Sequence, residues 1–157
     1  MNATTQLTDK DALKLKALIA PSYPELKKIK DLEKIKQHLL GLTRLFLSKQ
    51  RDDLTTLPES IGKLTQLEWL FLDGYQNLQT LPDSIGQLEN LKRFSVSSSM
   101  ITVLPNNICQ LKNLEELYLN SCSNLVALPE NISNLTELTH LILLNCKNIK
   151  TLPDSIG

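Results

Sequence analysis

The chain has 157 residues, 34 of them leucine, and its 17 basic residues balance its 17 acidic residues. This length suits one domain with a substantial hydrophobic core, so neither disulfides nor a metal ion is needed for stability. The lack of a basic surplus argues against a nucleic-acid-binding protein, and no apolar run approaches the roughly 20 residues of a membrane-spanning helix.

Residues 1–41 predict two short helices. Thr8 and Asp11 have the spacing of a capping box, which predicts a first helix up to Ala20. Pro24 then suits the first turn of a second helix. In that second helix the apolar residues recur every three or four positions and form one stripe opposite the lysines: Leu26, Ile29, Leu32, Ile35 and Leu39.

From Leu42 to Gly157 the sequence is repetitive. A Leu-Pro dipeptide recurs at spacings of 24, 23, 24 and 24 residues, at Leu57-Pro58, Leu81-Pro82, Leu104-Pro105, Leu128-Pro129 and Leu152-Pro153. An isoleucine lies three residues after each of these prolines, and each complete unit opens with the apolar pattern L-x-x-L-x-L. A fixed period in the twenties predicts a solenoid of stacked units.

Each unit predicts a short strand followed by a tight turn. The central L-x-L alternates with a period of two, which is typical of a strand with one buried face. The Leu-Pro-x-x-Ile-x-x-Leu segment steps by three, which fits a 3-10-like turn. Stacking the units buries their leucines as one column and pairs their strands in parallel. The predicted fold class is therefore α/β, with about five parallel strands on the concave face and short helical turns on the convex face.

Four consecutive units match a known pattern closely, among them LEWLFLDGYQNLQTLPDSIGQLEN and LEELYLNSCSNLVALPENISNLTE. They resemble the leucine-rich repeat family, in the 23–24-residue type found in bacterial effectors, plant intracellular immune receptors and Ras-pathway scaffolds. The resemblance implies a right-handed, horseshoe-shaped solenoid at 42–157, its last repeat incomplete, after a helical N-terminal cap at 1–41. It also implies a module that recognises other proteins.

The charge of the N-terminal segment leaves two interpretations open. Through Arg51 the chain has 11 basic and 5 acidic residues, whereas the remainder has 6 and 12. A solenoid needs a cover over its exposed end, so the lysines can simply be the solvated side of a cap. Alternatively, they form a basic surface that docks an acidic partner or an anionic membrane.

The outward positions of the predicted strands are the candidate protein-binding site. They change from unit to unit, whereas the core positions are almost uniformly leucine. Four of the seven aromatic residues lie there beside two arginines, which is the composition enriched in protein interfaces. An alternative is an incidental face of β-favouring residues, with Phe46 or Phe71 covered by the cap. The candidate residues are Arg44, Phe46, Trp69, Phe71, Asp73, Arg93, Glu116, Tyr118, Asn120, His140 and Ile142.

We expect no catalytic, cofactor or metal site. Cys122 and Cys146 occupy a position where the repeat pattern implies an inward side chain, whereas His140 faces outward, so no nucleophile meets a base. Two histidines without clustered cysteines or carboxylates do not form a zinc site. The five glycines form no phosphate-binding loop.

The expected function is therefore non-catalytic protein–protein recognition through the concave face. One alternative is the targeting part of a larger bacterial effector, for example an E3 ubiquitin ligase, and another is a structural spacer. Because the last repeat is uncapped, we expect either a fragment of a longer protein or end-to-end self-association. Residues 1–7 lack a signal-peptide pattern, which predicts a cytoplasmic protein, or alternatively an effector secreted into a host cell.

Overall fold

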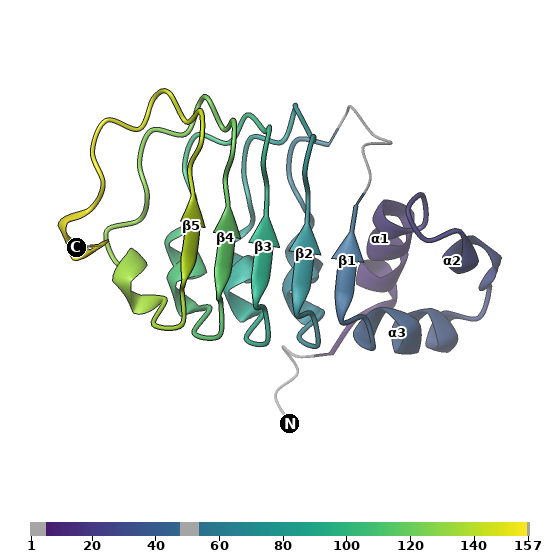
Figure 1. Ribbon diagram of the computed structural model, residues 1–157. Coiled ribbons are helices and arrows are strands. Elements are labelled where there is room, and N and C mark those ends of the chain that lie inside the picture. Colours follow the sequence, from purple (N-terminus) through teal and green to yellow (C-terminus); the bar gives the residue numbers. More distant parts are fainter. Residues whose placement is uncertain (1–5, 48–53, 157) are drawn as a thin grey trace.

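The computed structural model describes residues 6–47 and 54–156. Within these ranges, five parallel strands form one open sheet in chain order: β1 (Arg44–Phe46), β2 (Trp69–Phe71), β3 (Arg93–Ser95), β4 (Glu116–Tyr118) and β5 (His140–Ile142). A 3-10 helix follows each strand: η2 (Glu59–Lys63), η3 (Asp83–Gln87), η4 (Asn106–Gln110), η5 (Ile132–Asn134) and η6 (Asp154–Ile156). The strands stand side by side in front of the 3-10 helices (Figure 1). The predicted α/β solenoid is confirmed.

The strands β2 to β5 are short because the backbone turns at the same position of each of their units. The eighth residue of four units has a positive φ, between 58° and 80°: Gly74, Ser98, Ser121 and Asn145. In this left-handed conformation three of these residues still donate their N–H to the neighbouring unit, as from Gly74 N to Ser97 O at 2.9 Å. After β2, β3 and β4 the turn therefore ends the strand without interrupting the hydrogen bonds between units.

One column of apolar side chains behind the sheet forms the core. The middle residues of successive strands pair in register, Leu45 with Leu70, then Phe94, then Leu117. All four side chains are fully buried. In β5 the equivalent Leu141 is only half-buried. The predicted end-to-end self-association would have to use this end of the column, and it stays a prediction.

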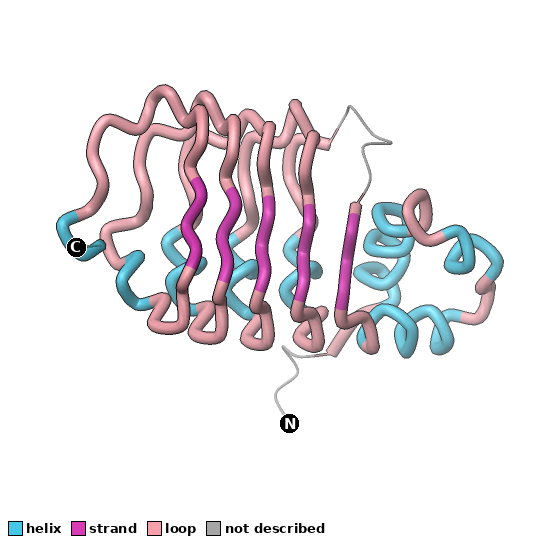
Figure 2. The backbone as a smooth tube through the Cα atoms, in the orientation of Figure 1, coloured by secondary structure: helices cyan, strands magenta, loops and turns pink. Residues whose placement is uncertain are grey.

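The N-terminal segment packs against the first unit as three helices in its described part: α1 (Asp9–Ile19), α2 (Pro24–Lys28) and α3 (Leu32–Leu40). Figure 2 shows them gathered beside β1, at the end of the sheet opposite β5. As predicted, Thr8 caps α1 by accepting a hydrogen bond from Asp11 N at 3.2 Å. The Thr8 hydroxyl and Lys63 lower the pKa of the Asp11 carboxyl.

The prediction of two helices is wrong, because the second one is interrupted. Ile29 has an extended backbone, with φ −77° and ψ 116°, and its carbonyl accepts a hydrogen bond from Lys16 Nζ. Asp31 then starts a new helix, since its side chain accepts a hydrogen bond from Lys34 N at 2.9 Å. The apolar stripe survives the break because Ile29 and Leu32 both still pack against the core.

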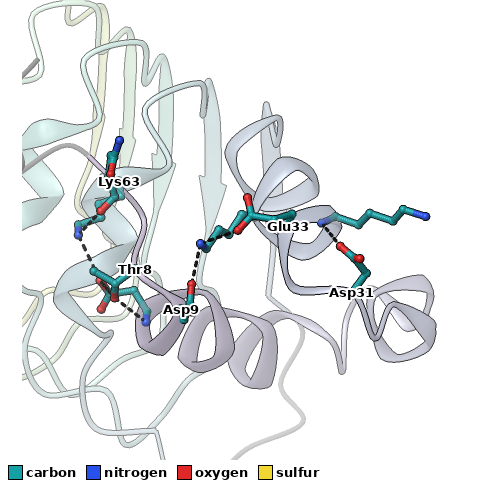
Figure 3. Close-up of polar contacts among 9 residues, drawn as sticks. Thr8, Asp9, Asp31, Glu33 and Lys63 are labelled. Atoms are coloured by element: carbon teal, nitrogen blue, oxygen red, sulfur yellow. Dashed lines mark hydrogen bonds and ion pairs between the residues drawn. The ribbon is translucent and has the colours of Figure 1, made fainter.

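Charged side chains connect the helices to each other and to η2 (Figure 3). Lys36 Nζ lies 2.6 Å from a carboxylate oxygen of Asp9 and 2.9 Å from one of Glu33, which ties α1 to α3. Lys63 Nζ in η2 lies 3.1 Å from Asp11 Oδ2 and donates to Gln6 O at 2.8 Å. These contacts fit the predicted role of a cap, because they hold α1 against the first unit.

Tyr23 covers the free edge of the sheet. Its hydroxyl donates to Arg44 O and accepts from Phe46 N, both at 3.1 Å. These are the backbone groups of β1 that a preceding strand would otherwise pair. The contact is made at the edge and leaves the face of the sheet open, so Phe46 is still 45 % exposed. One interpretation of the sequence had Phe46 covered by the cap, and this exposure contradicts it.

No helix in the part of the chain that the structure describes has the length and apolar composition needed to cross a membrane.

Candidate protein-binding surface

The sheet register places the predicted outward residues in two continuous rows on the face opposite the 3-10 helices, called here the outer sheet face. The first row contains Arg44, Trp69, Arg93, Glu116 and His140. The second row contains Phe46, Phe71, Ser95, Tyr118 and Ile142. Residues about a repeat apart in sequence are therefore side by side in space, at the strand spacing of about 4.8 Å.

Three aromatic rings from β1 and β2 contact one another on this face. The rings of Phe46 and Phe71 are stacked, with centroids 5.0 Å apart and planes 22° from parallel. Trp69 meets both rings in edge-on geometry, at 6.3 Å from Phe46 and 6.5 Å from Phe71. Distances of this kind are favourable for aromatic pairs. The rings are thus held in place by one another before any ligand binds.

Two arginines flank the tryptophan. The guanidinium carbon of Arg44 lies 3.9 Å from the centre of the Trp69 ring, and that of Arg93 lies 4.8 Å from it. Both distances are within the range of cation–π attraction. We call Arg44, Phe46, Trp69, Phe71 and Arg93 the aromatic–arginine cluster. It spans three neighbouring strands.

The cluster continues into β4 through an ion pair. Arg93 Nη2 lies 3.1 Å from Glu116 Oε1, and the Tyr118 hydroxyl donates to Glu116 Oε2 at 2.7 Å. The carboxylate of Glu116 raises the pKa of Tyr118, because a phenol that donates to an anion loses its proton less readily. Glu116 and Tyr118 are therefore oriented by contacts within the protein.

The pH dependence of stability is expected to reveal this hydrogen bond. The pKa of Tyr118 is raised in the folded state, so its stabilising contribution is complete below the unfolded-state pKa of about 10 and is lost as the pH rises through the folded-state value. The difference in unfolding free energy between wild type and Tyr118→Phe should be constant from neutral pH to about pH 9 and shrink above pH 10. Urea titrations at each pH measure it. A difference that grows above pH 10 would contradict the assignment.

Asp73 and Asn120, also predicted as binding residues, use their side-chain oxygens within the fold. Asp73 Oδ1 accepts hydrogen bonds from the Ser95 hydroxyl and, at 2.9 Å, from Ser97 N. Asn120 Oδ1 accepts from Leu144 N at 3.2 Å. Each bond joins a unit to the next one along the solenoid. Alternation along the strand could not reveal this role, although the run of short polar residues at this position is a signal for it.

The remaining candidates lie away from the cluster. His140 is exposed on β5, with Nδ1 2.9 Å from the Thr139 hydroxyl, and Ile142 is half-buried on the same strand. Between these two residues and the cluster, the second row contains Ser95, a small side chain that is only 2 % exposed. The structure thus connects seven of the predicted residues, the cluster together with Glu116 and Tyr118, through side-chain contacts, and it places His140 and Ile142 at the far edge.

The three cysteines are buried in the repeats and form no disulfide. As expected from the repeat pattern, Cys122 and Cys146 are buried, and their thiols donate to Val96 O at 3.3 Å and to Leu119 O at 2.9 Å. Burial raises the pKa of the Cys109 and Cys146 thiols. Across residues 6–47 and 54–156, no three His, Cys, Asp or Glu side chains are grouped in a way that could hold a metal ion.

Solved structures with the same architecture come from bacteria and plants. A leucine-rich repeat protein of Leptospira interrogans shares 35 % identity at a TM-score of 0.53, over 82 % of this chain and 37 % of that one. The ectodomain of the receptor kinase GASSHO1/SCHENGEN3 from Arabidopsis thaliana shares 25 % identity at 0.51, over 62 % and 13 %. An internalin from Listeria monocytogenes shares the fold at 20 % identity and 0.57, over 97 % and 53 %.

The chain spans less than two thirds of each of these three proteins. No curated protein matches the sequence. The family model called leucine-rich repeat region matches residues 13–151 of the chain, which include most of the helical cap as well as the repeats. With this match, the 23–24-residue period and the parallel sheet, the chain belongs to the leucine-rich repeat family.

Proposed function

We propose that this chain is a protein-recognition module that binds its partner through the outer sheet face, with the aromatic–arginine cluster as the central contact. Leucine-rich repeats generally serve as interaction scaffolds rather than as enzymes. The Arabidopsis receptor ectodomain was solved in complex with Casparian strip integrity factor 2. That complex supports ligand binding as one use of this architecture.

The observation that carries the proposal is the placement of three contacting aromatic rings on a solvent-facing surface. Phe46 is 45 % exposed, and Trp69 and Phe71 are only half-buried, whereas the leucine column behind them is fully buried. The core is therefore complete without these rings. Tryptophan and arginine are also the residues most enriched among binding hot spots.

The test compares two double variants. Trp69→Ala/Phe71→Ala removes the centre of the cluster, and Val103→Ala/Val126→Ala removes two apolar side chains that are each 52 % exposed elsewhere on the surface. Proteins captured from a lysate of the source organism are quantified for each variant. We expect the cluster variant to lose its partner by about 30-fold or more, the effect of a hot spot of about 2 kcal/mol. The control should bind normally.

The control should melt close to wild type, and the cluster variant should lose only the ring and cation–π contacts of the outer sheet face, because neither change truncates a side chain of the buried column. A large loss of stability in the cluster variant would show that the rings belong to the core. Equal capture by the two variants would favour a structural spacer. The targeting part of a larger effector remains the other alternative, and it predicts the same dependence on the cluster.

A further inference from the structure

We infer that the partner presents a carboxylate beside an apolar side chain, with the carboxylate on Arg44 and the apolar side chain against Phe46 and Phe71. This inference rests on the proposed function and specifies the chemistry of the partner. Its basis is the difference between the two arginines of the cluster.

Only one of these arginines has its charge available. Arg93 is paired with Glu116 at 3.1 Å, and Tyr118 holds the second oxygen of that carboxylate. Arg44 is exposed, and none of the carboxylates in the described residues forms an ion pair with it. Its guanidinium lies over the Trp69 ring at 3.9 Å. In that position the planar group keeps N–H donors at its rim for an incoming anion.

The charge around Arg44 also favours an acidic partner. Residues 6–47, which form the cap and β1, contain nine basic and five acidic side chains. Of the acidic residues at the strands, Glu68 precedes β2 and its carboxylate lies 3.7 Å from Lys92 Nζ, whereas Glu115 and Glu116 lie at β4. The β1 end of the sheet therefore adjoins the segment of the chain with the basic surplus (Figure 1). Complementary charge at an interface accelerates association and disfavours wrong partners.

The apolar half of the proposed contact is next to the charged half. Arg44 and Phe46 are two residues apart on one strand and face the same side, so their positions are about 6.5 Å apart. Phe71 stacks on Phe46 and widens the apolar area. Alternate residues of an extended segment have the same spacing. An extended partner segment with an acidic residue two positions from an aromatic or aliphatic one would satisfy both contacts.

Binding of a partner peptide to this surface can be followed by the fluorescence of Trp69, because it is the only tryptophan of the chain. The probe is a short peptide in which Asp and Phe alternate through serine spacers, and its twin carries Asn in place of Asp. Saturation of the Trp69 fluorescence change gives a Kd for each peptide. We expect the Asp peptide to bind at least ~10-fold more tightly at low salt, as for a hydrogen bond to a charged group. Added salt should reduce this preference.

Two variants test whether the preference for the Asp peptide arises at Arg44. Arg44→Gln should remove the preference for Asp over Asn, whereas Lys147→Gln, which neutralises an exposed lysine beyond β5, should retain it. Equal binding of both peptides to wild type would overturn the inference and leave the proposed function standing. An equal loss in the two variants, or no fluorescence change with either peptide, would also overturn the inference. The capture experiment tests the proposed function separately.

Discussion

Replacing Phe94 with alanine is expected to destabilise the protein by about 3–5 kcal/mol, the usual cost of truncating a buried aromatic side chain. Phe94 is fully buried in β3, in register with Leu70 on one side and Leu117 on the other. A cavity at this point lies in the middle of the column, where the units on both sides are held by their own contacts and cannot close it. Urea denaturation followed by circular dichroism measures the loss.

The matched control is Phe94→Leu, which places at this position the residue that the other four strands carry there. It keeps most of the apolar volume, so we expect a loss below about 1.5 kcal/mol. If both variants were equally unstable, the aromatic ring itself would be required. If neither were destabilised, the column would not be the stabilising core that its burial indicates.

Gly86→Ala is expected to cost about 2–3 kcal/mol, although it adds a single methyl group. A Cβ at Gly86 would lie 2.3 Å from the backbone oxygen of Asn107, and one at Gly62 would lie 2.3 Å from the backbone oxygen of Ser84. These atoms belong to the next 3-10 helix, so no side-chain rotation relieves the overlap. The helices η3 and η4 would have to separate.

Gly41→Ala provides the control for the effect of glycine itself. Gly41 follows α3, and a Cβ there would be 3.3 Å from its nearest neighbour, Gln37 O. Gly41 has a negative φ of −88°, which alanine also adopts, so its replacement should stay within about 1 kcal/mol of wild type. A Gly86→Ala protein as stable as Gly41→Ala would mean that the 3-10 helices can separate without cost.

The glycine positions show which requirement the repeat pattern predicts and which one depends on packing between units. Cys109 occupies in η4 the position that Gly62 and Gly86 occupy in η2 and η3, and it is buried. The repeat alone predicts a small residue at all three positions. Whether that residue must be glycine depends on how closely the following helix approaches, which differs between units.

The N-terminal helices also contain a feature that the sequence pattern does not predict, the break between α2 and α3. The apolar stripe from Leu26 to Leu39 has helical spacing, which predicted one continuous helix. The spacing is preserved across the interruption because both sides of it pack on the same core. The capping bond of Asp31 and the contact between Lys16 and the Ile29 carbonyl decide that a new helix begins there. The second of these contacts is with a different helix, so local periodicity cannot report it.

The sequence is enough to predict the solenoid, the number and register of the strands in the described part, and the two outward rows. It could do so because these features depend on apolar spacing within a unit and on its repetition every 23–24 residues. Tertiary structure alone decided which outward side chains are engaged within the protein. Asp73 and Asn120 bond to the next unit, and Glu116 pairs with Arg93, whereas none of the described carboxylates pairs with Arg44. The physical reason is that each such contact joins residues of neighbouring units, which lie far apart along the chain and only about 4.8 Å apart across the sheet.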